Sequence, residues 1–289
     1  MNLQEGIPIG PKTTMRIGGT ARYYAELTTK REVEEAWQFA EEKKIALIVL
    51  GGGSNSIFAG PVVDALVVRL KATNVAKQNN LLDVEAGKIL ASLVAESAEQ
   101  GLDLSILTGI PGTVGGAVFG NAGQGQKGPW IDSFIRSITV FVDGKWKAFS
   151  RDECAFRYRE SGFKDMPRAP IIWSAILEVP QGEPTAIKAE IERLIKKRIE
   201  TQPHLKTAGS CFKTLPDGTM AWQLIDKAGL RGLKIGGIQV SEKHANFLLN
   251  VDKGTFDDAK AIVERIKHDV PQIPSVEMRF YDPYGKLVF

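Results

Sequence analysis

The sequence is poor in cysteine, histidine and long apolar runs, and each shortage excludes a class of protein. Its 289 residues include two cysteines, Cys154 and Cys211, which lie far apart and form no C-x-x-C pair. A disulfide framework or a cysteine-based zinc site is therefore not expected. The three histidines, His204, His244 and His268, show no metal-ligand spacing, so no metal site is predicted.

The sequence predicts neither a signal peptide nor a membrane span. The first ten residues, MNLQEGIPIG, have neither a basic start nor an apolar core, and the longest aliphatic run is Ile45–Leu50. A membrane span needs about 20 apolar residues. The net charge of +3 suits an anionic ligand but is not the concentrated basic stripe of a nucleic-acid-binding protein. These features predict a cytoplasmic protein with no membrane span and no nucleic-acid partner.

Glycine, in contrast, is concentrated in two short segments. Residues 49–55 read VLGGGSN after a buried-strand pattern, and residues 108–123 read TGIPGTVGGAVFGNAG. Consecutive glycines after a strand can form a turn whose N–H groups converge on an anion, although a plain tight turn would explain the first cluster alone. The Val and Phe residues of the second cluster argue against a flexible linker. Together the clusters predict a dinucleotide-sized cofactor bound by close backbone approach, without a P-loop lysine or a dinucleotide fingerprint.

The periodicity of apolar residues predicts an α+β fold, because helices and strands mix without a regular βα repeat. Helices are expected around residues 31–43, 88–102, 187–199, 220–228 and 255–270. Strands are expected at residues 45–50, 65–70, 81–86, 137–142, 170–179 and 276–282. The Asp143-Gly144 pair predicts a hairpin turn. The Pro- and Gly-rich residues 180–184 predict a domain boundary.

The helix after this boundary has two distinct faces in its pattern. One side is expected to be apolar and to carry Ile187, Ile191, Leu194, Ile195 and Ile199. The other is expected to carry Arg193, Lys196, Lys197 and Arg198. This run of charge is interpreted as a solvated helix face rather than a binding surface.

Reactive candidates lie in the second half of the chain. Ser210 stands between small residues in TAGSCFK, where no G-x-S-x-G elbow indicates a hydrolase. Glu277 lies in an apolar strand pattern, as a partnered carboxylate or as one that faces solvent. Arg157 and Arg159 in FRYRES have strand-like spacing, so both are expected on one side. Their guanidinium forks suit a carboxylate or phosphate, and a plain surface pair is the alternative.

Taken in order, seven segments of the chain resemble the UDP-N-acetylenolpyruvoylglucosamine reductase family. They are TTMRIGG, LGGGSN, GIPGTVGGAVFGNAG, YRES, GSCFK, GLRGLKIGGIQVSEKHANFLLN and VEMRF. The resemblance implies an FAD-binding domain of the vanillyl-alcohol oxidase type over residues 1–182, in two α+β subdomains of about 1–70 and 71–182. It implies a C-terminal α+β substrate-binding domain over residues 183–289. The interval between Arg159 and Ser210 is that of the short family form, which lacks an extra tyrosine-bearing loop.

The resemblance also implies a cofactor and a reaction. FAD would be bound without a covalent tether, and NADPH would supply the hydride that reduces the enolpyruvyl group of UDP-N-acetylglucosamine enolpyruvate, for peptidoglycan synthesis. The implied cofactor residues are Leu50, Gly51, Gly52, Gly53, Ser54, Asn55, Ile110, Pro111, Gly112, Thr113, Gly115, Gly116, Ala117, Asn121 and Gly123. A monomer is expected.

The implied catalytic residues follow from the same motifs. Arg159 and Glu277 would hold the substrate carboxylate, and Ser210 would donate a proton at C2. Tyr158, Lys213 and Asn246 would bind the substrate. An alcohol oxidase of the same fold is a rival, but neither glycine cluster has the His or Cys that such enzymes use to tether flavin. A non-catalytic nucleotide-binding module is a second rival, and it would not need the three catalytic residues.

Overall fold

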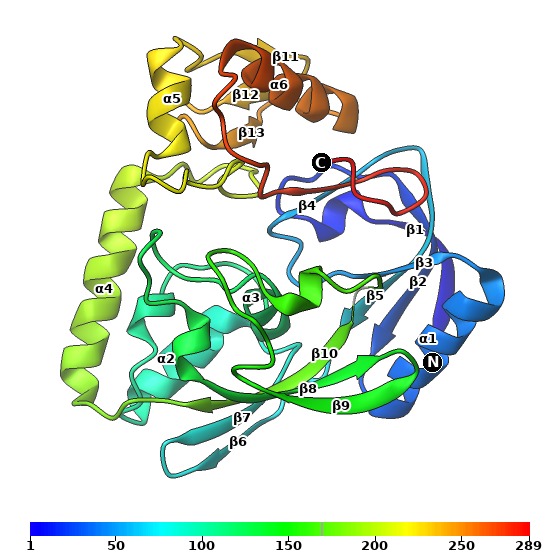
Figure 1. Ribbon diagram of the computed structural model, residues 1–289, viewed down its shortest axis with the longest axis vertical. Helices are drawn as coiled ribbons and strands as arrows, with labels where there is room; N and C mark the ends of the chain where they lie inside the picture. The colour runs from blue at the N-terminus through cyan, green and yellow to red at the C-terminus, as the bar shows by residue number, and fades with distance from the viewer. Residues whose placement is uncertain (169) are drawn as a thin grey trace. The chain divides into compact units, whose positions relative to one another are not determined.

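The computed structural model covers residues 1–289 and describes all of them except residue 169. The chain forms two compact units (Figure 1). Unit 1 comprises Met1–Leu3, Ala25–Gly52 and Leu66–Arg198, and unit 2 comprises Gln4–Tyr24, Gly53–Ala65 and Ile199–Phe289. Helices and sheets occur in both units, which confirms the α+β prediction. The expected domain boundary at residue 182 stays a prediction.

Unit 1 contains a five-stranded antiparallel sheet in the order β6-β7-β10-β8-β9. Its strands are β6 Val75–Gln78, β7 Leu81–Glu85, β10 Ile171–Glu178, β8 Ile135–Val142 and β9 Lys145–Ser150. Strands β8 and β9 are joined by Asp143 and Gly144, with φ of 51° and 73°. Both angles are positive, as a two-residue type I′ hairpin requires, so the predicted turn is confirmed.

Helices α2 (Leu90–Glu99) and α3 (Val114–Phe119) pack on this sheet and close the core of unit 1 (Figure 1). The inward positions predicted for α2 are all buried, namely Leu90, Leu93, Val94 and Ala98. Short 3₁₀ turns connect the elements: η2 Ser105–Leu107, η3 Ile131–Phe134 and η4 Gly162–Lys164. The core therefore lies directly beneath the second glycine-rich segment, whose middle is α3.

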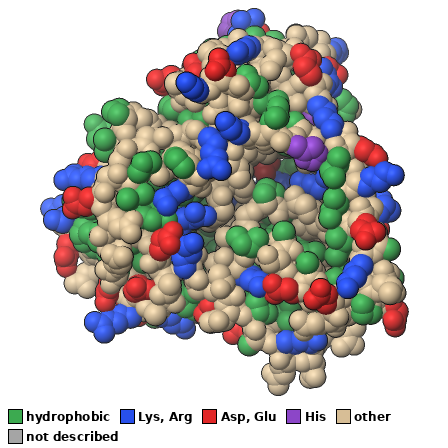
Figure 2. Space-filling model, turned by 180° about the vertical axis from the view of Figure 1, so that it is seen from behind, with side chains coloured by type: hydrophobic (Ala, Val, Ile, Leu, Met, Phe, Trp, Pro, Cys, Tyr) green, Lys and Arg blue, Asp and Glu red, His purple; other side chains and the backbone are tan. Residues whose placement is uncertain are grey.

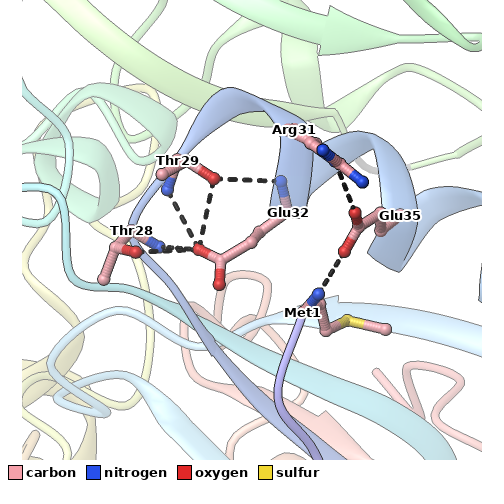
Figure 3. Close-up of polar contacts among 6 residues, drawn as sticks. All are labelled: Met1, Thr28, Thr29, Arg31, Glu32 and Glu35. Carbon is pink, nitrogen blue, oxygen red and sulfur yellow. Dashed lines mark hydrogen bonds and ion pairs between the residues drawn. The ribbon is translucent and has the colours of Figure 1, made fainter.

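Helix α1 (Lys30–Lys43) begins with a capping box. The Thr29 hydroxyl accepts a hydrogen bond from the Glu32 N–H at 3.2 Å, and the Glu32 carboxylate accepts from the Thr29 N–H at 3.1 Å (Figure 3). Glu32 also accepts from the N–H of Thr28 at 2.7 Å. These bonds lower the pKa of Glu32, the Thr28 backbone bond most of all. Further along the helix, Glu35 pairs with Arg31 and with the Met1 amine.

Thr29→Ala is expected to lower the free energy of unfolding by about 1 kcal/mol, because it removes the acceptor for an otherwise unpaired helix N–H. Urea denaturation followed by circular dichroism measures this change. Thr29→Ser keeps the capping hydroxyl and is the matched control, expected within a few tenths of the wild type. Equal losses in both variants would mean that the methyl group of Thr29, and not the cap, matters.

Helix α4 (Pro184–Thr201) forms as predicted, but three residues were assigned to the wrong face. Ile195 and Ile199 are 42% and 51% exposed, whereas Ile187 and Leu194 are buried. At 3.6 residues per turn, the buried stripe that starts at Ile187 continues through Leu194 to position 198. Position 199 does not lie on this stripe. Arg198, expected on the solvated face, therefore lies on the inward one.

Unit 2 is built on a three-stranded antiparallel sheet that the sequence did not predict. Its strands are β11 Lys234–Ile235, β12 Ile238–Val240 and β13 Leu248–Asn250. Helices α5 (Ala221–Lys227) and α6 (Phe256–Asp269) belong to the same unit and confirm two predicted helices. The late strand is confirmed as β14 (Arg279–Tyr281), which pairs in parallel with β4 (Ser56–Phe58).

A further sheet has the order β1-β2-β5-β3. Its strands are β1 Leu3–Pro8, β2 Thr20–Leu27, β5 Val62–Leu70 and β3 Ala46–Val49, and the 3₁₀ turn η1 Gly10–Lys12 follows β1. Strand β3 leads directly into the first glycine cluster. The sequence predicted β3 and the end of β5, but not β1 and β2.

The surface carries both signs of charge. On the face drawn in Figure 2, Lys and Arg side chains are spread widely and Asp and Glu side chains lie among them. Within the described part of the chain, no helix combines the length and the apolar character that crossing a bilayer requires.

Candidate active site

Two glycine-rich loops meet in unit 1. A Cβ atom on Gly52 would lie 2.6 Å from the Cα of Gly112, and one on Gly51 would lie 2.9 Å from Thr113 Oγ1. The N–H groups of Gly51, Gly52, Gly112 and Thr113 donate to no acceptor in residues 1–168 or 170–289. The Thr113 hydroxyl caps α3 by accepting from Gly116 N–H. The loops thus gather unused backbone donors beside the start of a helix, where an anion is favourable.

The structure corrects the reason for several glycines. They were expected to make room for a ligand, but most make room for the protein itself. A Cβ on Gly115 would lie 2.8 Å from the Cβ of Ala86, and one on Gly123 would lie 2.6 Å from the Cα of Trp130. Gly116 differs, because its nearest neighbour would be Thr113 Oγ1 at an ordinary 3.6 Å and its surface is exposed. Gly116 is therefore the glycine at which ligand contact can be tested cleanly.

Gly116→Val is expected to lower the flavin content of the purified protein strongly, because the Cβ would have no protein neighbour closer than 3.6 Å and the side chain would enter the space assigned to the cofactor. Absorbance of the flavin per mole of protein measures the loss, and circular dichroism should show an unchanged fold. Gly120→Ala is the control, since its Cβ would lie 3.5 Å from the Gly116 carbonyl oxygen. Full flavin content in Gly116→Val would remove Gly116 from the cofactor residues. The same test at Gly52 or Gly115 would be confounded by protein clashes.

The other predicted cofactor residues of unit 1 have varied surroundings. Leu50 and Ala117 are buried, Ile110 packs against the core and Pro111 is exposed. Asn121 is fully buried, with φ of 42°. Its amide nitrogen donates to the Arg157 carbonyl at 3.0 Å, and its amide oxygen accepts from Asp132 N–H at 3.3 Å. The side chain of Asn121 thus fixes the segment that carries Arg159.

Arg159 stands at the tip of a two-residue hairpin rather than on a strand. Arg157 and Glu160 exchange both backbone hydrogen bonds at 3.0 Å, and Arg159 has φ of +58°. A positive φ at this position marks a type II turn, which costs a non-glycine residue about 1–2 kcal/mol.

The two arginines of this hairpin have different surroundings, which corrects the prediction that they share a face. Arg157 is exposed and pairs with Asp165 at 2.7 Å. Arg159 is half-buried, with its guanidinium 5.4 Å from the ring centroid of Tyr158. Tyr158 in turn lies 5.9 Å from the ring of Trp130. Tyr158 and Arg159, both predicted site residues, are therefore direct neighbours.

In unit 2 the Ser210 segment lies between two others. Cys211 N–H donates to the Asn246 carbonyl at 2.7 Å, and the Asn246 amide both accepts from Phe212 N–H at 2.9 Å and donates to the Phe212 carbonyl at 2.8 Å. On the other side, Glu277 N–H donates to the Cys211 carbonyl at 2.7 Å. The main chain near Ser210 is thus held from both sides. Asn246, predicted to bind substrate, has its amide engaged with the main chain of Phe212.

The pairing of these segments sets which side chains share a face. Phe212 stands opposite Val276, so Cys211 stands opposite Glu277. Cys211 is fully buried, and this burial, together with the charge of Glu277, raises the pKa of its thiol far above the usual range. Ser210 is half-buried and Lys213 is anchored by its N–H to the Ser275 carbonyl at 3.0 Å. The thiol of Cys211 is buried, whereas Ser210 is only half-buried. This difference fits the prediction that Ser210, and not Cys211, is the proton donor.

The end of the first glycine cluster belongs to unit 2. Gly53 has φ of +68°, and its carbonyl accepts from Thr14 N–H at 3.0 Å. The side chain of Asn55 donates to the Glu277 carbonyl at 3.0 Å. Ser54 is half-buried. Gly53 and Asn55 therefore connect the cluster to the TTMRIGG and VEMRF segments.

Sequence reasoning missed two residues beside this site. Arg198 lies against Gly109, with its Nε 2.7 Å from where a Cβ of that glycine would be. Thr108, the preceding residue, has a buried hydroxyl without a partner among the described residues. The inward position of Arg198 could have been found from helical phase, but no sequence signal marks the hydroxyl. Among the described residues no group of three or more His, Cys, Asp or Glu side chains gathers at metal-binding distance.

The arrangement in unit 1 fits FAD. Unused N–H donors at Gly51, Gly52, Gly112 and Thr113 match the acceptor oxygens of a pyrophosphate, and the orphaned Thr108 hydroxyl adds another polar group near the same loop. Gly116, in the first turn of α3, is exposed, and a Cβ there would have no neighbour closer than 3.6 Å, which leaves space for a ligand. Which of these atoms touches the cofactor stays a prediction.

Comparison with known proteins identifies two families. Residues 21–149 match the family described as "FAD binding domain". Residues 202–280 match "UDP-N-acetylenolpyruvoylglucosamine reductase, C-terminal domain". The FAD-binding domain and the C-terminal domain of the predicted fold are thereby confirmed.

Relatives match over nearly the full length. The chain is 35% identical to the UDP-N-acetylenolpyruvoylglucosamine reductase of Chlamydia trachomatis serovar L2 over 271 residues, covering 92% of this chain and 90% of the relative. It is 35% identical to the Aquifex aeolicus protein of the same name, covering 92% and 89%. The crystal structure of the reductase from Thermus caldophilus superposes with a TM-score of 0.84 at 30% identity, covering 96% of this chain and 99% of that one.

Proposed function

Because this chain belongs to the UDP-N-acetylenolpyruvoylglucosamine reductase family, we propose that it reduces the enolpyruvyl group of UDP-N-acetylglucosamine enolpyruvate to a lactyl ether. FAD is the bound cofactor and NADPH the hydride source. The observation that carries this proposal is the near full-length similarity to reductases of that name, across both the FAD-binding and the C-terminal domain.

The residues of this chain have separate tasks in the reaction. FAD, when bound, supplies the hydride chemistry. Arg159 and Glu277 bind the substrate carboxylate and stabilise the negative charge that develops at C2 once hydride is added at C3. For this task Glu277 is protonated or shares a proton with the substrate, so that it donates a hydrogen bond to the carboxylate. Ser210 then donates its hydroxyl proton to C2. Tyr158, Lys213 and Asn246 bind the rest of the substrate.

Several finer assignments follow from the same proposal. The product is a precursor of peptidoglycan, so the protein would act in the cytoplasm and contribute to cell-wall formation, cell shape and cell division. It would work as a monomer. The presence of Ser210, Arg159 and Glu277 together supports its assignment as a working enzyme, because a nucleotide-binding module would not need all three.

The visible spectrum of the purified protein tests the proposal. A flavin spectrum that bleaches with NADPH without oxygen, and recovers when the enolpyruvyl substrate is added, is the expected result. Denaturation should release free flavin, since no tether is expected. A protein that takes up no FAD, or a bleached one that the substrate does not reoxidise, would overturn the proposed function.

A further inference from the structure

Arg198 occupies a position where helix geometry calls for an apolar residue. It continues the inward stripe of α4 that starts at Ile187 and passes through Leu194, and its surface is partly buried. The exposed basic residues of the same helix, such as Lys196, lie off this stripe. A guanidinium turned inward loses hydration, so it needs a compensating partner.

The side chain of Arg198 lies across the start of the second glycine-rich segment. Its Nε and Cζ are 2.7 Å and 3.4 Å from the position that a Cβ of Gly109 would take. Gly109 has φ of +74°, so the backbone turns there in a way that favours glycine. A Cβ at position 109 would force the Arg198 side chain to shift.

Without a ligand, the electrostatic environment of Arg198 disfavours its positive charge. Burial lowers the pKa of its guanidinium, and the positive charge of Arg159 lowers it further. No carboxylate of residues 1–168 or 170–289 pairs with it. Other arginines of unit 1 do have partners: Arg157 pairs with Asp165, Arg151 with Asp132 and Arg193 with Glu190.

We propose that Arg198 and Arg159 together bind the carboxylate of the substrate, so that Arg198 is a second anion-binding residue of the active site. A carboxylate has two oxygens and can accept from two guanidinium forks at once. It would also offset the repulsion between the two arginines. This inference rests on the proposed function, because the carboxylate belongs to the enolpyruvyl group.

Arg198→Met tests the proposal, since methionine retains part of the apolar stem and removes the charge. The dissociation constant for the enolpyruvyl substrate, measured by calorimetry on the oxidised protein, is expected to rise about 10- to 100-fold. Arg198→Lys keeps the charge but loses the fork, and is expected to fall between wild type and Arg198→Met. Lys196→Met, which removes an exposed charge from the same helix, is the control and should bind normally.

Two other ligands test which anionic group Arg198 binds. UDP-N-acetylglucosamine carries the diphosphate but no carboxylate. Arg198→Met should therefore bind UDP-N-acetylglucosamine with the same dissociation constant as the wild type. The rate of flavin bleaching by NADPH should also be unchanged. An equal loss of affinity for both sugar nucleotides would mean that Arg198 binds the diphosphate. A slower bleaching of the flavin by NADPH, with unchanged affinity for the sugar nucleotides, would mean that Arg198 binds a phosphate of NADPH. Either result overturns the proposal.

Thermal unfolding separates a binding role from a structural one. With no substrate present, Arg198→Met should unfold at the wild-type temperature or slightly above it, because an unpaired inward charge is removed. Lower stability with unchanged substrate affinity would make Arg198 a structural residue and overturn the inference. If the wild type itself failed to bind the enolpyruvyl substrate, the proposed function would fail instead.

Discussion

Ser210→Ala is expected to slow overall turnover by about 10²- to 10⁴-fold, the range typical of a lost general acid, while NADPH still bleaches the flavin at a near-normal rate. The first half-reaction needs no proton at C2 of the substrate, and the second does. Cys211 cannot replace the hydroxyl, because its thiol is fully buried and its pKa is raised by that burial. Stopped-flow absorbance measures each half-reaction separately.

Ser275→Ala is the matched control, since it removes an exposed hydroxyl from the neighbouring segment. It should leave both half-reactions unchanged. Equal slowing of both by Ser210→Ala would indicate a structural or binding role for Ser210. An unchanged second half-reaction would show that the proton comes from another group.

Arg159→Ala and Glu277→Gln are each expected to lower turnover by about 10²- to 10³-fold, the usual cost of removing one preorganised group that stabilises developing charge. Alanine at position 159 would carry the same backbone strain as arginine, whose φ is +58°. The loss in Arg159→Ala therefore reports on the guanidinium alone. Glu277→Gln retains a hydrogen-bond donor but cannot share a proton. Steady-state kinetics with NADPH and the enolpyruvyl substrate measure both variants.

Arg157→Ala is the control for the first variant, because Arg157 belongs to the same hairpin but is exposed and paired with Asp165. Its turnover should stay within a few-fold of wild type. Near-normal turnover in Arg159→Ala or Glu277→Gln would mean that the motif assigned that residue a wrong role. A large loss in Arg157→Ala would place the defect in the hairpin rather than in the Arg159 side chain.

Elements that carry a clear local signal were predictable from the sequence, whereas elements without one were not. Helix α2 and the β8–β9 hairpin carry local signals, namely apolar spacing and an Asp-Gly turn, and both formed as expected. The turn at Tyr158 and Arg159 carries no Gly or Asn, so its alternating arginines looked like a strand. The three-residue strands β12 and β13 are too short to show a period and depend on pairing with each other.

The site residues named from the sequence stay predictions, and the structure shows contacts at several of them that the sequence did not reveal. Motif order pointed to the FAD-binding domain, but the contacts of Gly52 and Gly115 are with Gly112 and Ala86. Similarly, Asn246 was assigned to substrate, while its amide holds the main chain of Phe212. Sequence shows that a residue type is needed at a position. It does not show whether a ligand or a distant segment of the same chain imposes that need.

The contact between Gly109 and Arg198 has a consequence for how this protein can diverge. Any side chain at position 109 would displace the Arg198 stem, and the φ of +74° disfavours a side chain there whatever residue occupies position 198. Position 109 is therefore constrained twice, whereas Gly109 places no limit on a smaller residue at position 198. Across relatives, glycine at position 109 is expected to persist even where position 198 differs.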